Sequence, residues 1–168
     1  MYVIRSATLQ DLPIVASWIR TADECERWAG TQVAFPINLS TLHRAIRFAE
    51  QNAYVMVMGG SVIAFGQVLD KPHNRQHLAT FIVSTMHRGR GYGRKFLLEL
   101  LHRASAGRVS LNVNEDNSVA ISLYAAAGFT AAERPQEQQA SPRTRYMEWL
   151  APSRAGDGTD STGSPSLP

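Results

Sequence analysis

A nine-residue stretch, HRGRGYGRK at residues 87–95, constrains the fold of this chain more than any other segment. The apolar run HLATFIV, which ends at Val83, precedes it. The segment YGRKFLLELLHRA follows, and its apolar residues recur at helical spacing. A strand, a glycine-rich loop and an amphipathic helix that begins at about Gly91 are therefore predicted in this order, with the helix packed on a sheet.

Two functions fit such a stretch. Arginine–glycine segments that bind RNA usually lie in low-complexity surroundings, whereas folded elements are predicted on both sides of this one. A strand–loop–helix unit instead directs free backbone N–H groups and the positive end of the helix dipole at an anion. Glycines let the backbone approach a phosphate closely, and Arg88, Arg90, Arg94 and Lys95 could add charge. A glycine-rich turn with solvated arginines is the alternative.

Neither common nucleotide motif fits the loop. The Walker pattern, Gly-x-x-x-x-Gly-Lys-Ser/Thr, is absent from the sequence. The dinucleotide fingerprint requires a third glycine where Arg94 stands.

The remaining sequence predicts one α/β domain over residues 1–150, built as three layers with a mixed central sheet and helices on both faces. Outside the loop unit, the predicted strands are MYVIRSA, the hairpin AYVMVM-GG-SVIAFGQVL, RVSLNV, FTAAERP and RYMEWL. The predicted helices are one carrying Leu12, Val15, Trp18 and Ile19, TLHRAIRFAEQN capped by Ser40, and SVAISLYAAAG capped by Asn117 and ended by Gly128. WAGTQVAFPIN is predicted as a loop, and HLATFIV as a strand buried on both faces. Residues 151–168 are predicted to be a disordered tail.

Composition limits the class of protein. The hydrophobic fraction of 44% and charged fraction of 18% are typical of a globular protein, and no signal peptide or membrane span is expected. The single cysteine, Cys25, cannot form an internal disulfide, which favours the cytoplasm. A net charge of +3 permits an anionic ligand without requiring nucleic acid.

Two motifs resemble a known family. FIVSTMHRGRGYGRKFLLELL resembles the central Arg/Gln-x-x-Gly-x-Gly/Ala motif of the GNAT superfamily of acetyl-CoA-dependent N-acyltransferases, at Arg88, Gly91 and Gly93. LNVNEDNSVAISLYAAAGF is similar to the second motif of that family, with Asn117 and Tyr124 at the expected places. With RSATLQDL and YMEWL as first and last strands, the resemblance covers roughly residues 3–150.

The resemblance implies a GNAT-like fold in which two parallel strands, HLATFIV and VSLNV, splay apart around the pantetheine of acetyl-CoA. The cosubstrate would be acetyl-CoA, without a metal. The pyrophosphate would lie on the N–H groups of residues 88–94. The implied cofactor-binding residues are Phe81, Ile82, Val83, Arg88, Gly89, Arg90, Gly91, Tyr92, Gly93, Arg94, Asn117 and Tyr124.

The implied reaction is transfer of an acetyl group to a primary amine by direct attack on the thioester. Tyr124 stands at the position of the general acid, although a core aromatic is the alternative. His77, with a pKa near 6.5, is a candidate base, or else a surface histidine with water as proton acceptor. Asn112 replaces the Glu that relatives acetylating protein N-termini often carry, and an amide cannot take a proton. A non-catalytic acyl-CoA binding or sensing domain, or an RNA-binding protein, are the alternative functions.

The acceptor is expected to be a small-molecule or peptide amine. In ADECERWAG and the loop that follows, Glu26 could attract a cationic amine together with Asp23 and Glu24, while Trp28 and Phe35 shape an apolar edge. The alternative is a solvated helix end beside core aromatics. A homodimer is compatible with the sequence.

Overall fold

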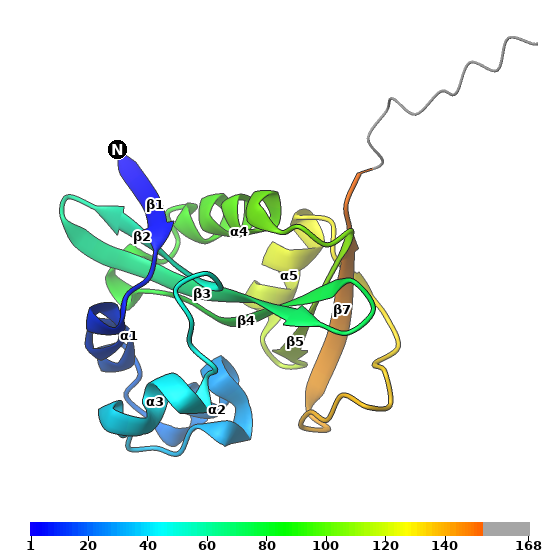
Figure 1. Cartoon of the computed structure of the whole chain (residues 1–168), viewed down its shortest axis with the longest axis horizontal. Coiled ribbons are helices and arrows are strands. Elements are labelled where there is room, and N and C mark those ends of the chain that lie inside the picture. The colour runs from blue at the N-terminus through cyan, green and yellow to red at the C-terminus, as the bar shows by residue number, and fades with distance from the viewer. Residues whose placement is uncertain (153–168) are drawn as a thin grey trace, which may run out of the picture.

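The computed structural model describes residues 1–152, and the predicted tail lies outside this range from residue 153 onward. In the described range the chain forms a mixed sheet with helices on both faces (Figure 1). In chain order the elements are β1 (Tyr2–Ser6), α1 (Leu12–Ser17), α2 (Ala22–Ala29), α3 (Leu39–Ala45), β2 (Ala53–Met58), β3 (Ser61–Lys71), β4 (Arg75–Val83), α4 (Tyr92–Arg103), β5 (Arg108–Asn114), α5 (Ser118–Ala126), β6 (Thr130–Ala131) and β7 (Thr144–Leu150). Short 3₁₀ turns lie at Leu9–Asp11, Gly30–Gln32 and Thr85–His87.

The sheet has the strand order β1-β2-β3-β4-β5-β7-β6. Neighbouring strands are antiparallel except for β4 and β5, which are parallel. The predicted hairpin is confirmed: Gly59 and Gly60 both have positive φ, as a two-residue primed turn requires.

Two apolar layers enclose the sheet, so the predicted three-layer arrangement is confirmed. One layer joins α4 and α5 to the sheet through residues such as Phe96, Leu100 and Phe129. The other joins α1, α2 and α3 through residues such as Val15 and Leu42. Figure 1 shows α4 and α5 on one side of the sheet and the three N-terminal helices on the other.

Five local predictions are wrong. Helix α1 ends at Ser17, so Trp18 and Ile19 lie beyond the helix in which they were expected. Trp28 and Ala29, predicted in a loop, end the amphipathic helix α2, which buries Trp28. Helix α3 ends at Ala45 and is capped by Asn38, whose side chain accepts from the backbone N–H of Ser40. Strand β6 has only two residues, which pair with Glu148 and Met147 of β7. Strand β4 is not buried on both faces, because its residues 77–81 border a cavity and alternate residues at its start are only half-buried.

No helix in residues 1–152 is both long enough and apolar enough to cross a membrane.

Candidate active site

The two parallel strands of the sheet pair only where they begin. The register of β4 and β5 contains Gln76 opposite Val109 and His77 opposite Ser110, and no further pair. Beyond these residues β4 continues to pair with β3, and β5 with β7. Within residues 1–152, the facing edges over residues 78–83 and 111–114 therefore have no strand partner, and the wedge between them suits an extended ligand that hydrogen-bonds like a strand.

A bulge bends β4 at the start of the wedge. Thr80 and Phe81 of β4 lie opposite the single residue Gly66 of β3, and Thr80 has a φ of 51°. Since a bulge bends its strand and increases the local twist, this feature turns β4 away from β5.

A buried chain of hydrogen bonds holds the bulge. The indole N–H of Trp28 donates to the Thr80 carbonyl at 2.8 Å. The Thr80 hydroxyl donates to the Gln67 side-chain carbonyl at 2.7 Å, and the Gln67 amide donates to the Ile46 carbonyl at 3.1 Å. Trp28, predicted at the acceptor edge, is 7% exposed, and its indole N–H is bonded to the backbone of β4. Its side chain also borders the cavity described below.

The glycine-rich loop presents a row of free donors. In the described part of the chain, no backbone or side-chain acceptor takes a hydrogen bond from the N–H groups of residues 88–94. Gly89 and Gly91 have φ values of 72° and 80°, and a Cβ on either would meet no atom of the described residues within 4 Å. Gly91 caps α4, so the donors lie at the positive end of a twelve-residue helix. The loop thus fits a phosphate group that approaches its backbone.

The arginine side chains of this loop differ in whether they contact the rest of the protein. Arg88 turns back to β4, where its Nε donates to the Val83 carbonyl at 2.9 Å. Arg90 and Arg94 form no ion pair with any described residue, so their charges remain available to an anion. A Cβ on Gly93 would lie 3.6 Å from Leu123 and Val83, an ordinary contact, so Gly93 is not required by packing.

Tyr124 projects from α5 into the wedge region. The Asn117 side chain caps this helix by accepting from the Ala120 N–H at 3.2 Å, as predicted. Tyr124 packs edge-on against Phe81 and Phe129, at centroid distances of 6.2 and 5.8 Å. Burial raises the pKa of its phenol above the usual value near 10.

The hydroxyl of Tyr124 has no hydrogen-bond partner among the described residues. Every fully buried side-chain N or O atom of these residues does have a partner, so this hydroxyl is not fully buried. The hydroxyl therefore keeps contact with the adjoining space. Tyr124 combines both predicted roles, a core aromatic ring and a donor directed at a cavity.

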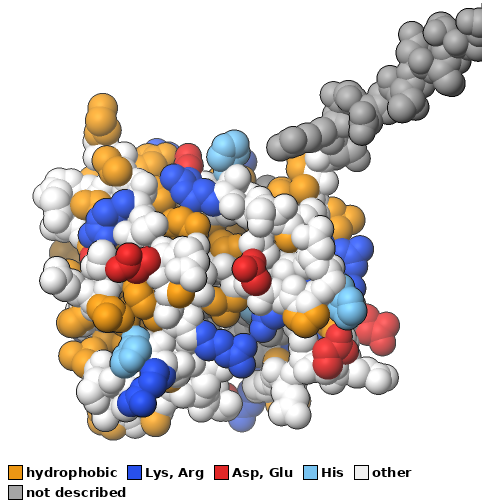
Figure 2. Space-filling view, viewed as in Figure 1, with side chains coloured by type: hydrophobic (Ala, Val, Ile, Leu, Met, Phe, Trp, Pro, Cys, Tyr) orange, Lys and Arg blue, Asp and Glu red, His pale blue; other side chains and the backbone are white. Residues whose placement is uncertain are grey.

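A cavity of about 530 Å³ lies on the α2–α3 side of the wedge. Residues of α2, β3, β4, β5, α5 and the loop at 137–141 line it, and they include the predicted Glu26, His77, Phe81 and Tyr124. The hollow in the lower half of Figure 2 lies beside the α2–α3 lobe of Figure 1, and Lys and Arg side chains gather around it. Phe35, predicted at the acceptor edge, does not line this cavity and is 38% exposed.

The environment of His77 lowers the pKa of its imidazole. Its Nδ1 lies 2.8 Å from the Ser110 hydroxyl. Burial, followed by the charges of Lys71 and Arg134, lowers the pKa of His77 to about 4. The expected pKa near 6.5 is therefore wrong, and the imidazole is neutral at pH 7.

Two polar residues that line the cavity, Asn112 and Thr144, are held by Arg134, a contact that the sequence did not indicate. Arg134 donates to the Asn112 side-chain oxygen at 3.1 and 3.0 Å and to the Thr144 carbonyl at 3.0 Å. Asn112, instead of supplying a base, anchors the chain that follows β6. No signal in the local sequence pairs these residues, since 22 positions separate Arg134 from Asn112.

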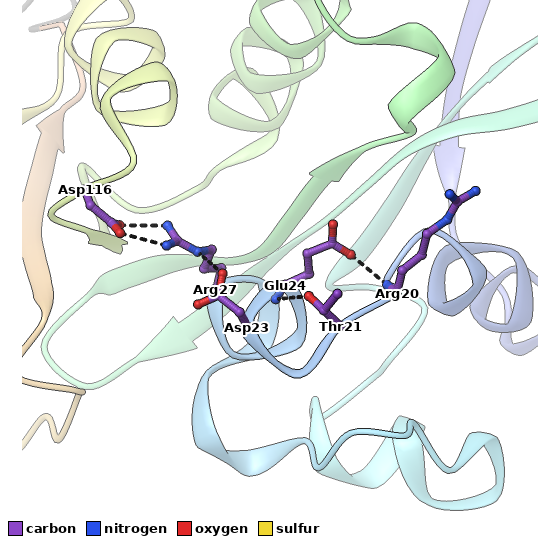
Figure 3. A network of polar contacts seen from close by, with 6 residues as sticks. All are labelled: Arg20, Thr21, Asp23, Glu24, Arg27 and Asp116. Atoms are coloured by element: carbon purple, nitrogen blue, oxygen red, sulfur yellow. Dashed lines mark hydrogen bonds and ion pairs between the residues drawn. The ribbon is translucent and has the colours of Figure 1, made fainter.

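An ion-pair network joins α2 to the loop after β5 (Figure 3). Arg27 donates to both carboxylate oxygens of Asp116 at 2.7 Å and to Asp23 at 2.7 Å. Glu24 accepts from the Arg20 backbone N–H at 2.7 Å. Of the three acids predicted to attract an amine, Asp23 and Glu24 thus form hydrogen bonds within the protein, and Glu26 lines the cavity.

Within residues 1–152, no group of three or more His, Cys, Asp or Glu side chains is arranged to hold a metal ion.

Comparisons with known proteins agree with this geometry. Mycothiol acetyltransferase of Corynebacterium efficiens is 28% identical over 125 residues, which cover 72% of this chain and 42% of that protein. N-alpha-acetyltransferase RimI of Mycobacterium tuberculosis is 35% identical over 74 residues, covering 42% of this chain and 47% of that protein. The chain therefore spans less than half the length of these curated relatives.

Solved structures share the fold. The ribosomal-protein-alanine N-acetyltransferase from Brucella melitensis superposes with a TM-score of 0.67 at 22% identity, covering 88% of this chain and 99% of that one. The spermidine N-acetyltransferase from Vibrio cholerae, solved with CoA and spermine, gives 0.68 at 17% identity, covering 89% and 95%. The model of the Acetyltransferase (GNAT) family matches residues 16–129, more than half of the sequence. This chain belongs to the GNAT acetyltransferase family.

Proposed function

We propose that this chain is an acetyl-CoA-dependent N-acetyltransferase, acting as a single domain over residues 1–150 on a primary amine. The observation that supports this most is the wedge between β4 and β5, whose facing edges are unpaired beyond His77 and Ser110. The free N–H groups of the glycine-rich loop and the hydroxyl of Tyr124 adjoin the same two strands, which favours one continuous site over separate features.

The backbone of Phe81, Ile82 and Val83 hydrogen-bonds the pantetheine arm in this proposal. The N–H groups of residues 88–94, with the charges of the arginines among them, bind the pyrophosphate. Asn117 contributes by capping α5 and so fixing the direction of Tyr124.

Bound acetyl-CoA supplies a thioester carbonyl, at which a neutral amine forms the new N–C bond as the C–S bond breaks. A backbone N–H near Val83 stabilises the negative charge that develops on the carbonyl oxygen. Tyr124 donates a hydrogen bond to the leaving sulfur. Since a thiol has a pKa near 8.5 and burial raises that of Tyr124, full proton transfer to the thiolate is unfavourable. Tyr124 therefore stabilises charge chiefly as a donor.

The amine must also lose a proton. His77 is neutral at pH 7, and its pKa of about 4 makes it a weak acceptor. We propose that water in the cavity relays this proton to bulk solvent, with His77 orienting the water and Ser110 fixing the ring.

A second function, non-catalytic binding of acyl-CoA, is favoured by one observation, the low basicity of His77. Release of CoA thiol in the presence of an amine separates the two functions, because a binding domain produces none.

The first test is a thermal melt with acetyl-CoA, free CoA and NAD. A ligand at about 100 times its Kd stabilises a protein by about 2.7 kcal/mol, which raises Tm by several degrees. We expect a shift with both CoA species and none with NAD, and then thiol release with some member of an amine panel. No shift with acetyl-CoA would overturn the proposal.

We further propose a cellular compartment for the protein and a way to measure its oligomeric state. Cys25 is a buried free thiol, which supports a reducing compartment such as the cytoplasm. A homodimer stays a prediction, and sedimentation of the purified protein measures it.

A further inference from the structure

Two cations line the cavity without an acidic partner among the residues that the structure describes. Arg47 follows α3 and Lys71 ends β3, and both border the cavity. Neither side chain forms an ion pair or a hydrogen bond with any residue in the described range. Arg27, the third cation at the cavity, is by contrast neutralised by Asp23 and Asp116.

The backbone holds Arg47 in an uncommon conformation. Its φ is 53°, in the left-handed region that non-glycine residues rarely adopt. Asn52 donates to the Arg47 carbonyl at 3.2 Å, and Gln67 fixes the preceding carbonyl of Ile46. The network that holds the β4 bulge therefore also positions Arg47. Such strain persists where the surrounding structure imposes it, often at ligand sites.

No described acidic side chain pairs with the positive charge at this end of the cavity. Burial, and then the charge of Arg47, lower the pKa of Lys71. The charge of Lys71 also contributes to the low pKa of His77. Glu26 and Glu137 line the same cavity, but neither lies within 4.0 Å of Arg47 or Lys71. A bound anion would relieve the repulsion between the two cations and favour the charged form of Lys71.

We propose that Arg47 and Lys71 form a subsite for an anionic group, a carboxylate or a phosphate, on the acceptor amine. This inference rests on the proposed acetyltransferase function and narrows its acceptor class. Glu26 and Glu137 remain for the ammonium of the same molecule, so the favoured acceptor carries both charges. A polyamine, which carries only positive charge, would meet two uncompensated cations.

The test uses acceptors matched in shape but not in charge. Acetyl-CoA turnover is measured with leucine and its C-terminal amide, with glutamate and its diamide, with phosphoethanolamine and ethanolamine, and with spermidine. Because hydrogen bonds to charged groups are the strong ones, we expect kcat/KM for an anionic member to exceed that of its neutral counterpart by about tenfold to a hundredfold. The amino acid and phosphate arms decide which anion is preferred.

Two variants connect the preference to the residues. Lys71→Met removes one charge, and Arg47→Asn removes the other with a residue that tolerates positive φ. Each should lower kcat/KM for the anionic member about tenfold or more beyond any change for its neutral counterpart. Arg44→Gln, on the exposed side of α3 and outside the cavity, is the matched control and should leave the preference unchanged.

The outcomes distinguish failure of the anionic subsite from failure of the proposed acetyltransferase function. Turnover that favours spermidine or the neutral members, or equal losses for both members in the variants, overturns the subsite while the acetyltransferase stands. Equilibrium binding gives a second readout: calorimetry with CoA present should detect the favoured anionic amine, and Lys71→Met should abolish that heat. No heat with any anionic amine also overturns the subsite. No binding of acetyl-CoA overturns the function itself.

Discussion

At the scale of single residues, burial decides the chemistry of the two titratable groups nearest the wedge. It raises the pKa of Tyr124 and lowers that of His77, so both side chains are neutral at pH 7. The site thus stabilises charge through donors and excludes a strongly basic side chain at these two positions.

Tyr124→Phe tests the donor role. The ring and its contacts with Phe81 and Phe129 are kept, while the hydroxyl is lost. Removing a hydrogen bond to a charged group costs about 1.5–3 kcal/mol, so we expect kcat to fall about tenfold to a hundredfold. Acetyl-CoA affinity, measured by calorimetry, should change less than about twofold, because only the transition state develops charge on sulfur. Unchanged kcat would return Tyr124 to a purely structural role.

His77 makes stability depend on pH. Its pKa is about 4 when folded and about 6.5 when unfolded, so below pH 6.5 the unfolded chain binds more protons. Its contribution is complete above pH 6.5 and is lost as pH falls to 4, by roughly 3 kcal/mol at most. We expect His77→Gln to lose less stability than the wild type between these pH values, measured by urea unfolding. Parallel curves for the two proteins would contradict the shifted pKa.

At the scale of elements, patterns within one segment were sufficient for most of the fold. The hairpin at Gly59–Gly60, helix α4 and the caps of α5 depend on neighbours in sequence, and these predictions are confirmed. The bulge in β4 and helix α2 depend on each other across 52 positions, through Trp28 and Thr80. No local pattern encodes that contact, so the sequence leaves Trp28 open between an apolar edge of the acceptor site and a core aromatic.

Trp28→Phe tests this link between elements. The substitution keeps an apolar ring but leaves the Thr80 carbonyl buried without its donor, which costs about 1–3 kcal/mol. We expect a lower free energy of unfolding and weaker acetyl-CoA binding, because the bulge sets the wedge. Trp18→Phe is the control, since the indole of Trp18 forms no hydrogen bond with a described residue. Equal effects of the two substitutions would show that the indole N–H of Trp28 does not matter.

The glycine loop has a matched control elsewhere in the chain. Gly91 and Gly60 both have a φ of 80°, and a Cβ added to either would meet no atom within 4 Å, but Gly60 lies in the hairpin turn. Valine at either position should destabilise the fold by a similar amount, about 1–3 kcal/mol of backbone strain. Only Gly91→Val should weaken acetyl-CoA binding, by more than about tenfold, because its side chain would enter the space of the phosphate. Calorimetry on both variants measures the difference.

At the scale of the whole molecule, the sheet consists of two parts joined weakly. Strands β1 to β4 form one part and β5 to β7 the other, and only two residue pairs connect them. The ion pairs of Arg27 with Asp116 add a second connection on the α2 side. A ligand that hydrogen-bonds both facing edges would complete the sheet and couple its parts.

Amide hydrogen exchange with and without acetyl-CoA measures this coupling. In the free protein, amides of residues 81–83 that face the wedge should exchange faster than those bonded to β3, because no described strand pairs with them. Acetyl-CoA should slow exchange at residues 81–83 and at 88–94 together. Free CoA should protect the same two segments, since pantetheine and pyrophosphate are common to both. Protection confined to residues 88–94 would mean that the loop binds a phosphate while the wedge stays empty, and the assignment of the wedge to pantetheine would then be wrong.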